Sequence, residues 1–108
     1  MALPNKTSVS PARQQLLEVF QRINFGRLES LTVARGQPTF DPSPVILREY
    51  KFGGENGPRP ELGNADFLLK QQVIDLFAFF DELQNGVIDV LEIKHGLPFR
   101  MIVTEVPA

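Results

Sequence analysis

The chain has no cysteine, no tryptophan and a single histidine among its 108 residues. The lack of cysteine excludes disulfides, thiolate metal sites and thiol catalysis, and one histidine, His95, cannot build a His-rich metal site. No stretch approaches the ~18 apolar residues that a membrane span needs, and the N-terminus lacks the basic start and apolar run of a signal peptide. We therefore expect a cytoplasmic protein without a cofactor, a bound metal or a membrane partner.

The chain also lacks a strong excess of either charge, because 11 basic and 13 acidic residues leave a formal net charge of −2. This balance disfavours nucleic acid and anionic membranes as partners, since both need a basic face. The hydrophobic share of 43% is ordinary for a soluble globular protein. The length is typical of one domain, and we treat 1–108 as a single domain.

An internal repeat with an offset of 60 positions (86 − 26 = 60) is the strongest pattern in the chain. A repeat fixes an architecture without naming a chemistry. It divides the domain into repeat one, about 11–52, a linker, about 53–64, and repeat two, about 65–106. The identities at this offset, which need no gap, are Leu16 and Leu76, Phe20 and Phe80, Gly26 and Gly86, Leu31 and Leu91, Gly36 and Gly96, and Pro38 and Pro98.

Each repeat begins with a predicted helix. In repeat one, Ser10-Pro11 is typical of a helix start, because serine caps free amides and proline suits the first turn. The apolar residues that follow have helical spacing, and we expect the helix to end at 24–26, where glycine can adopt a left-handed conformation. In repeat two the pattern predicts a helix over 65–84, capped by Asn64 or Asp66.

Two strands follow the helix in repeat one. Alternation over 27–35 places Leu31 on one face of the first strand and Leu28 on the other. The return strand is interrupted by the prolines of 41–44, because proline cannot donate to a central ladder, and it resumes over 45–52.

Repeat two ends in predicted strands over 87–94 and 97–106, whose register can be argued from the apolar positions. A two-residue loop pairs Leu91 with Arg100 and puts arginine in the core. A three-residue loop pairs Leu91 with Phe99 and keeps the apolar residues on one face. We therefore predict the second register and a buried Phe99.

The fold follows from the repeat. One helix and one hairpin cannot bury a face alone, whereas two such units can pair around a pseudo-two-fold axis. We therefore predict an α+β fold: a four-stranded, mainly antiparallel sheet with two helices on one face. The hairpin turns at Arg35-Gly36 and His95-Gly96 require positive φ at their glycines.

The order Phe25-Gly26, strand, Arg35-Gly36, strand resembles the small YezD-like bacterial proteins of unknown function. The resemblance is best over 16–52. Repeat two carries it over 76–105, with Asn85-Gly86 in place of the aromatic–glycine step. It implies a tandem, two-copy bacterial relative of a unit that otherwise has to dimerise, and it implies no known activity.

Glu29 and Asp89 are a candidate carboxylate pair, because they occupy equivalent positions on equivalent predicted strands. Paired carboxylates perform acid–base chemistry or hold a cation. The alternative, which we favour, is that each lies at the solvated start of its strand, near Arg27 and a helix end. No residue is assigned a catalytic role.

The glycine-rich loop between the repeats is a candidate recognition loop through Glu55, Asn56 and Arg59. Loops of this length inside small domains are often functional. The alternative is a plain linker, because the loop lacks the Lys-Ser/Thr of a phosphate-binding loop.

Leu68, Phe79 and Leu83 form a candidate interface, because they widen the apolar stripe of the second helix beyond a single sheet contact. Soluble monomers seldom expose a contiguous apolar patch, which favours a homodimer or another protein partner. Alternatively, the first helix and the N-terminal tail cover these residues.

Three functional hypotheses remain. The first is a small non-catalytic interaction module of the bacterial cytoplasm, homo-oligomeric and not an enzyme. The second is a nucleic-acid-associated regulator that uses the first hairpin and the loop to Arg59; its candidate exposed aromatics are Tyr50, Phe52 and Phe99, the last of which our register buries. The third is a carboxylate-based enzyme or cation site at Glu29 and Asp89.

Overall fold

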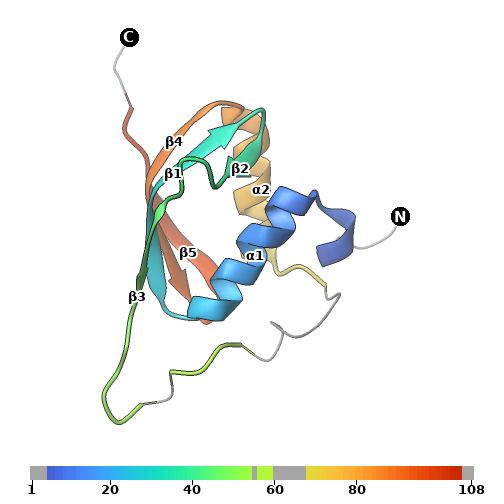
Figure 1. The fold of residues 1–108 in the computed structure, drawn as a ribbon. Coiled ribbons are helices and arrows are strands. Elements are labelled where there is room, and N and C mark those ends of the chain that lie inside the picture. Colours follow the sequence, from blue (N-terminus) through green and yellow to red (C-terminus); the bar gives the residue numbers. More distant parts are fainter. Residues whose placement is uncertain (1–4, 55, 60–67, 106–108) are drawn as a thin grey trace.

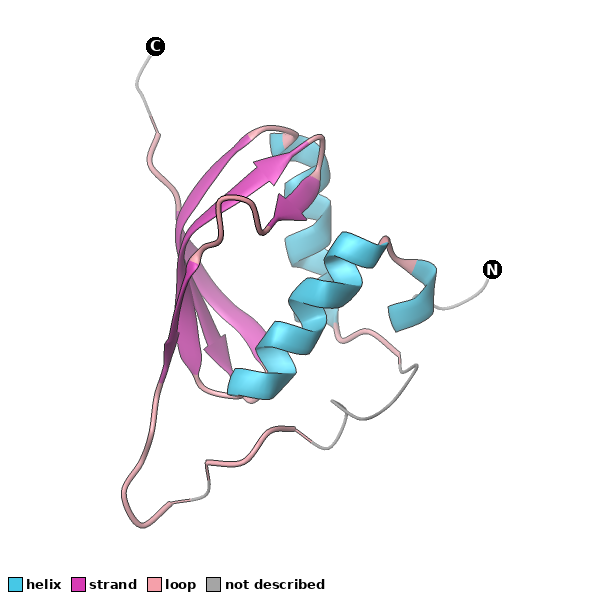
Figure 2. Cartoon of the chain, viewed as in Figure 1, coloured by secondary structure: helices cyan, strands magenta, loops and turns pink. Residues whose placement is uncertain are grey.

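Two helices pack against one face of an open sheet, and no helix of the described residues covers the other face (Figures 1 and 2). This computed structural model describes residues 5–54, 56–59 and 68–105. The fold is α+β, as the sequence predicts. In chain order the elements are η1 (Lys6–Ser8), α1 (Pro11–Ile23), β1 (Gly26–Ala34), β2 (Gln37–Thr39), β3 (Val45–Arg48), α2 (Gln71–Leu83), β4 (Gly86–Lys94) and β5 (Leu97–Ile102).

The sheet has five strands in the order β2-β1-β4-β5, with β3 also paired to β1. Every pairing is antiparallel. The predicted number of four strands is wrong, because the return strand of the first half is divided into β2 and β3. The segment 41–44 between them contains two prolines, which cannot donate to a ladder.

The two helices differ in how they begin. α1 starts as predicted, with Ser10 Oγ accepting a hydrogen bond from the amide of Arg13 at 3.2 Å. α2 starts at Gln71, later than predicted, and no side chain caps its first amides. The caps proposed for it, Asn64 and Asp66, lie outside the described residues.

The inward face of β1 changes at Ser30, whose φ is +59°. Leu28 and Leu31 are both fully buried, although strict alternation places them on opposite faces. The β1–β4 ladder passes over this position, joining Leu28 to Leu91 and Leu31 to Ile88. The predicted faces of this strand are therefore wrong, because one residue leaves the extended conformation.

The β4–β5 hairpin has the two-residue turn His95-Gly96 and not the predicted three-residue loop. A bulge lies in the ladder between Glu92 and Ile93, so that Glu92 pairs with Arg100 and the extra residue of β5 is Phe99. Phe99 is 62% exposed, and its predicted burial is wrong. The bulge keeps both the arginine and this phenylalanine out of the core.

The predicted positive φ of the turn glycines is confirmed, with +75° at Gly36 and +70° at Gly96. The residue before each glycine is also left-handed, with φ of +53° at Arg35 and +56° at His95. Two consecutive left-handed residues are typical of the tight turns that match strand twist. β1 and β4 begin and end within one residue of the prediction, whereas β3 and β5 stop earlier, at residues 48 and 102.

The core lies between the helices and the sheet (Figure 2). Phe20 of α1 and Phe80 of α2 are completely buried within it. The two prolines that follow the turns, Pro38 and Pro98, also face inward. The remaining buried apolar residues are Leu16, Leu17, Val19, Ile23, Leu28, Leu31, Val33, Val73, Leu76, Phe77, Ile88, Leu91 and Ile93.

Candidate functional site: the open sheet face and its basic hollow

The sheet face that points away from the helices, here called the open face, carries both apolar and charged side chains. Its membership follows from the register, because residues opposite one another in a ladder point to the same side. Four of its apolar side chains, on β3, β4 and β5, are between 39% and 52% exposed. These four are Val45, Leu47, Val87 and Ile102, and the charged members are Arg27, Glu29, Glu92 and Arg100.

The charges of the open face are paired with one another. Arg27 Nε lies 3.2 Å from Glu29 Oε2 on the same strand. Arg100 binds Glu92 with two nitrogens, Nε to Oε2 at 2.9 Å and Nη2 to Oε1 at 2.8 Å. The hydrogen bonds from Arg100 lower the pKa of Glu92, and the same carboxylate raises the pKa of Arg100. The four charges therefore sum to zero at neutral pH.

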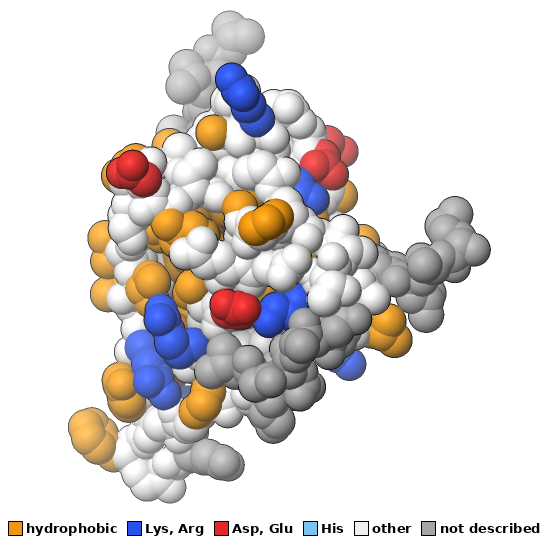
Figure 3. Space-filling view, turned by 45° about the vertical axis from the view of Figure 1, so that its right-hand side comes forward, with side chains coloured by type: hydrophobic (Ala, Val, Ile, Leu, Met, Phe, Trp, Pro, Cys, Tyr) orange, Lys and Arg blue, Asp and Glu red, His pale blue; other side chains and the backbone are white. Residues whose placement is uncertain are grey.

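A hollow of about 530 Å³, here called the basic hollow, opens at the end of this face where β3 leaves the sheet. Figure 3 shows basic and hydrophobic side chains gathered at lower left, beside the loop that follows β3. Two glutamates also line the hollow, so positive charge is in excess there. The cations are Arg27, Arg48, Lys51 and Lys94, the carboxylates are Glu49 and Glu92, and the apolar walls are Phe25, Leu47, Ile93 and Phe99.

Cationic side chains lie against aromatic rings at the basic hollow. Lys51 Nζ lies 5.0 Å from the ring centre of Phe25, and Lys94 Nζ lies 5.2 Å from that of Phe99. Next to them, Arg48 Cζ lies 4.8 Å from the ring centre of Tyr50. Each distance is within the range of a cation–π contact. Positive charge beside aromatic rings is the chemistry that binds an anion with a flat, apolar part.

The candidate carboxylates have separate partners. Glu29 pairs with Arg27, whereas Asp89 accepts hydrogen bonds from the amide of Thr104 at 2.6 Å and from its hydroxyl at 2.7 Å. Within the described ranges, no three His, Cys, Asp or Glu side chains form a group that could hold a metal ion. His95, the single histidine, packs edge-on against Phe25 with ring centres 4.9 Å apart.

The candidate recognition loop is organised by Asn56. The side-chain oxygen of Asn56, Oδ1, accepts a hydrogen bond from the backbone N–H of Lys51 at 2.8 Å, and its side-chain nitrogen, Nδ2, donates one to the Lys51 carbonyl at 3.0 Å. Arg59 is tied to α1 by its backbone N–H, which donates to the carbonyl of Gln21 at 2.9 Å. Glu55 lies outside the described residues. The loop therefore forms one wall beside the basic hollow and then crosses to the helix layer.

The candidate interface on α2 is not one exposed patch. Phe79 and Leu83 are partly buried against the core, and Leu68 is exposed but precedes the helix. The more extensive exposed apolar surface lies on the open face instead. The sequence pattern does not predict this surface. Alternation shows which residues share a face of a strand, but it does not show which face the helices cover.

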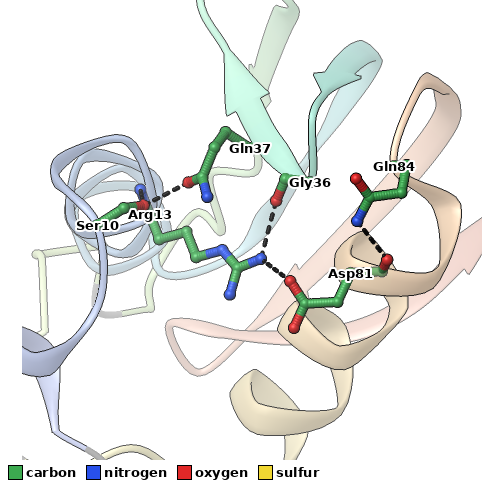
Figure 4. A network of polar contacts seen from close by, with 6 residues as sticks. All are labelled: Ser10, Arg13, Gly36, Gln37, Asp81 and Gln84. Atoms are coloured by element: carbon green, nitrogen blue, oxygen red, sulfur yellow. Dashed lines mark hydrogen bonds and ion pairs between the residues drawn. The ribbon is translucent and has the colours of Figure 1, made fainter.

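Sequence reasoning also missed a polar network between the helices and the first hairpin (Figure 4). Arg13 Nη2 donates to the Gly36 carbonyl at 2.8 Å and lies 2.6 Å from Asp81 Oδ1. Its guanidinium also lies over the Phe77 ring, 5.0 Å from its centre. An arginine on the inner side of an amphipathic helix, three residues before the first buried leucine, is the signal that could have found this network.

We found no match to the chain among protein-family models, curated proteins or solved structures. The resemblance to YezD-like proteins therefore stays a prediction. No helix in the described part of the chain is both long and apolar enough to cross a bilayer.

Proposed function

We propose that the protein is a small, non-catalytic interaction module that associates with a second copy of itself through the open face. The observation that carries this proposal is the joint exposure of Val45, Leu47, Val87 and Ile102 on a face that neither helix covers. Soluble proteins seldom leave such a surface in water unless a partner covers it.

The charge pattern of the open face supports a second copy as the occupant. A two-fold symmetric interface brings the same patch of both copies together, so the patch must complement itself. Arg27 and Glu29 lie two positions apart on β1. When two copies meet face to face, a two-fold axis perpendicular to the strands and midway between these positions places each arginine opposite the glutamate of the other copy. The four paired charges, which sum to zero, and the apolar side chains at the margins fit this arrangement.

We further propose that the two halves are copies of one unit related by a pseudo-two-fold axis. Two observations support this. α1 and α2 both span 13 residues and begin 60 positions apart (71 − 11 = 60). The offset also relates two residue pairs of the β1–β4 ladder to each other. Leu28 pairs with Leu91, and their equivalents at the offset, Ile88 (28 + 60) and Leu31 (91 − 60), also pair. The central ladder then replaces the dimer contact that a single-copy relative would make.

Self-association is tested by changing Ile102 to glutamate. A charge in the apolar margin of the contact loses packing and must be desolvated, so we expect dimerisation to weaken at least about tenfold. Sedimentation velocity at micromolar concentrations measures the shift, with circular dichroism to confirm folding. The matched control is Gln15→Glu, which adds the same charge on the exposed side of α1.

Two outcomes would contradict the open face as the interface. A wild-type protein that stays monomeric at high micromolar concentration would remove self-association altogether. A dimer that is unchanged in Ile102→Glu but weakened in a Phe79→Glu variant would place the interface on α2, with Leu68 and Leu83, as the amphipathic pattern predicts.

A second candidate function, binding of single-stranded nucleic acid, is favoured by one specific observation: the three cation–aromatic pairs at the basic hollow. We expect a fluorescent oligonucleotide to bind at low salt and to lose affinity about five- to a hundredfold in Phe99→Ala, because one stacked base is lost. Lys94→Gln is expected to reduce the salt slope by about 1. Binding is measured by anisotropy titration. Either no binding by the wild-type protein, or binding by both variants that equals that of the wild type, would exclude this candidate.

A further inference from the structure

The basic hollow has an excess of two positive charges, because four cationic and two acidic side chains line it. Its volume of about 530 Å³ is within the range of small-molecule sites. The charges are not equivalent, since some have an oppositely charged partner inside the chain and others have none. The partners of each group therefore show which charges are left for a ligand.

The two arginines of the hollow are held by the protein itself. Arg27 pairs with Glu29 at 3.2 Å, which neutralises its charge. Arg48 donates a hydrogen bond to the backbone carbonyl of Asn56 and lies over the ring of Tyr50. A neutral carbonyl fixes the guanidinium in the wall but leaves its positive charge in place.

The two lysines of the hollow have no polar partner. Lys51 Nζ and Lys94 Nζ each lie over an aromatic ring, but neither forms an ion pair or a hydrogen bond with a residue that the structure describes. A ring face attracts a cation without neutralising it. Both ammonium groups therefore keep the N–H donors and the charge that bind an anion.

The two carboxylates of the hollow also differ. Glu92 is held by two hydrogen bonds from Arg100, which neutralise it. The side chain of Glu49 accepts no hydrogen bond from a described residue and keeps its capacity as an acceptor. With the two internal ion pairs set aside, one arginine and both lysines remain beside Glu49, and the excess of two positive charges is unchanged.

Phe99 is the ring of the hollow that is open to a flat ligand. Its side chain is 62% exposed, because the bulge in β5 turns it away from the core. The ring of Phe25, in contrast, already contacts His95 edge-on and has Lys51 over it. Lys94 Nζ lies 5.2 Å from the centre of the Phe99 ring, so one ligand can place an anionic group and a flat ring at these two residues.

We propose that the basic hollow binds a phosphate monoester joined to a flat ring, as in a free nucleotide or at the phosphorylated end of a single strand. The phosphate meets Lys51 and Lys94, the ring stacks on Phe99, and Glu49 accepts a hydrogen bond from an N–H or O–H of the ligand. This inference deepens the second candidate function, because it names the group that the cation–aromatic pairs recognise, and it does not rest on self-association.

Charge favours a monoester over other anions. A phosphate monoester carries about −1.5 to −2 charges at neutral pH, which matches the excess of positive charge in the hollow. A phosphodiester inside a nucleic-acid strand carries a single negative charge. The hollow is therefore matched to a terminal phosphate and not to the middle of a strand.

Adenosine monophosphate (AMP) is the probe, and cyclic AMP is its matched control, because it keeps the ring and the sugar while its phosphate is a singly charged diester. In NMR titrations of the full chain, we expect AMP to shift the amide signals of Lys51, Lys94 and Phe99. We expect AMP to bind about tenfold more tightly than cyclic AMP, since it offers the lysines one more charge. Adenosine, which has no phosphate, and ribose phosphate, which has no flat ring, should both bind more weakly than AMP.

Two oligonucleotides of one sequence distinguish the two sources of such a group. One ends in a phosphate and the other in a hydroxyl. If the ligand is a strand end, the phosphorylated oligonucleotide binds more tightly than the other and displaces AMP. If the ligand is a free nucleotide, AMP binds and neither oligonucleotide displaces it.

Four variants locate the site. Lys51→Gln and Lys94→Gln each remove one charge from the hollow and should weaken AMP binding about tenfold. Lys70→Gln removes the same charge outside the hollow and should leave binding unchanged. Phe99→Ala removes the stacking ring and should weaken binding about five- to a hundredfold. Its control is Phe52→Ala, because Phe52 is fully exposed and does not line the hollow.

The proposal is overturned if AMP causes no shifts at millimolar concentration, or if its shifts map away from the hollow. It is also overturned if cyclic AMP or adenosine binds as tightly as AMP, or if the two hollow lysine variants bind AMP as Lys70→Gln does. A hydroxyl-ended oligonucleotide that binds through Phe99, while AMP does not bind, would remove this inference and leave the second candidate function standing.

The same titrations in Ile102→Glu separate this inference from self-association. Ile102 does not line the hollow, so we expect the variant to bind AMP as the wild type does. AMP binding by a monomeric protein supports the site even where self-association fails. The absence of AMP binding in both proteins overturns the site, whatever their oligomeric state.

Discussion

Replacement of Gly26 by alanine is expected to destabilise the fold by about 3 kcal/mol or more. An ideal Cβ at this position would lie 2.1 Å from the carbonyl oxygen of Leu47 and 3.1 Å from the Cα of Arg48. Both neighbours are backbone atoms of β3, which no side-chain rotation can move. β3 would have to separate from β1, and the basic hollow would lose one wall. Urea denaturation measures the change.

Gly86 provides the matched control, because it begins β4 as Gly26 begins β1. A Cβ there would meet only the side chain of Leu83, at 3.0 Å, and a leucine side chain can move. We expect Gly86→Ala to cost less than about 1 kcal/mol. Equal costs for the two variants would show that β3 does not pack against Gly26 as described.

Phe20→Ala is expected to lower the free energy of unfolding by about 3–5 kcal/mol. Phe20 has no exposed surface and lies in the core between α1 and the sheet. Truncation removes the buried ring and leaves a cavity that the rigid surroundings fill only in part. For a domain of this size, such a loss is a large part of the total stability. Chemical denaturation, monitored by circular dichroism, gives the value.

Phe52→Ala is the control for this truncation, because the ring of Phe52 is fully exposed. We expect a change within about 0.5 kcal/mol, as for other surface substitutions. A loss below about 2 kcal/mol in Phe20→Ala, or a comparable loss in Phe52→Ala, would contradict the assigned core.

The features that the sequence predicted well depend on local chemistry. Ser10 and the following proline mark the start of α1, and the left-handed turns at Gly36 and Gly96 follow from glycine between two predicted strands. The mainly antiparallel sheet follows from the hairpin connections. Each of these features is decided by a few neighbouring residues, so the pattern in the chain is sufficient.

The features that could not be predicted depend on single backbone deviations. Ser30 adopts a positive φ and moves Leu28 to the inner face, yet serine occurs in regular strands as well. The bulge in β5 turns Phe99 outward while keeping Arg100 beside Glu92. Such a bulge is decided by how the whole ladder fits the core, which local composition does not describe.

The candidate sites likewise divide into what local sequence decides and what the folded structure decides. The sequence places Glu29 and Asp89 at equivalent positions with Arg27 nearby, and Arg27 does pair with Glu29, but it does not show that Thr104 binds Asp89. Side-chain partners on neighbouring strands depend on register, and a one-residue error changes every one of them.

The central ladder has a consequence for how the chain acquires its structure. Leu28 pairs with Leu91, 63 positions later (91 − 28 = 63), so the middle of the sheet cannot form until most of the chain is present. Contacts between such distant segments slow folding, because a long loop must close first. On the ribosome, β1 emerges with the side that later meets β4 unpaired, and we expect nascent chains that stop before residue 86 to associate through this edge.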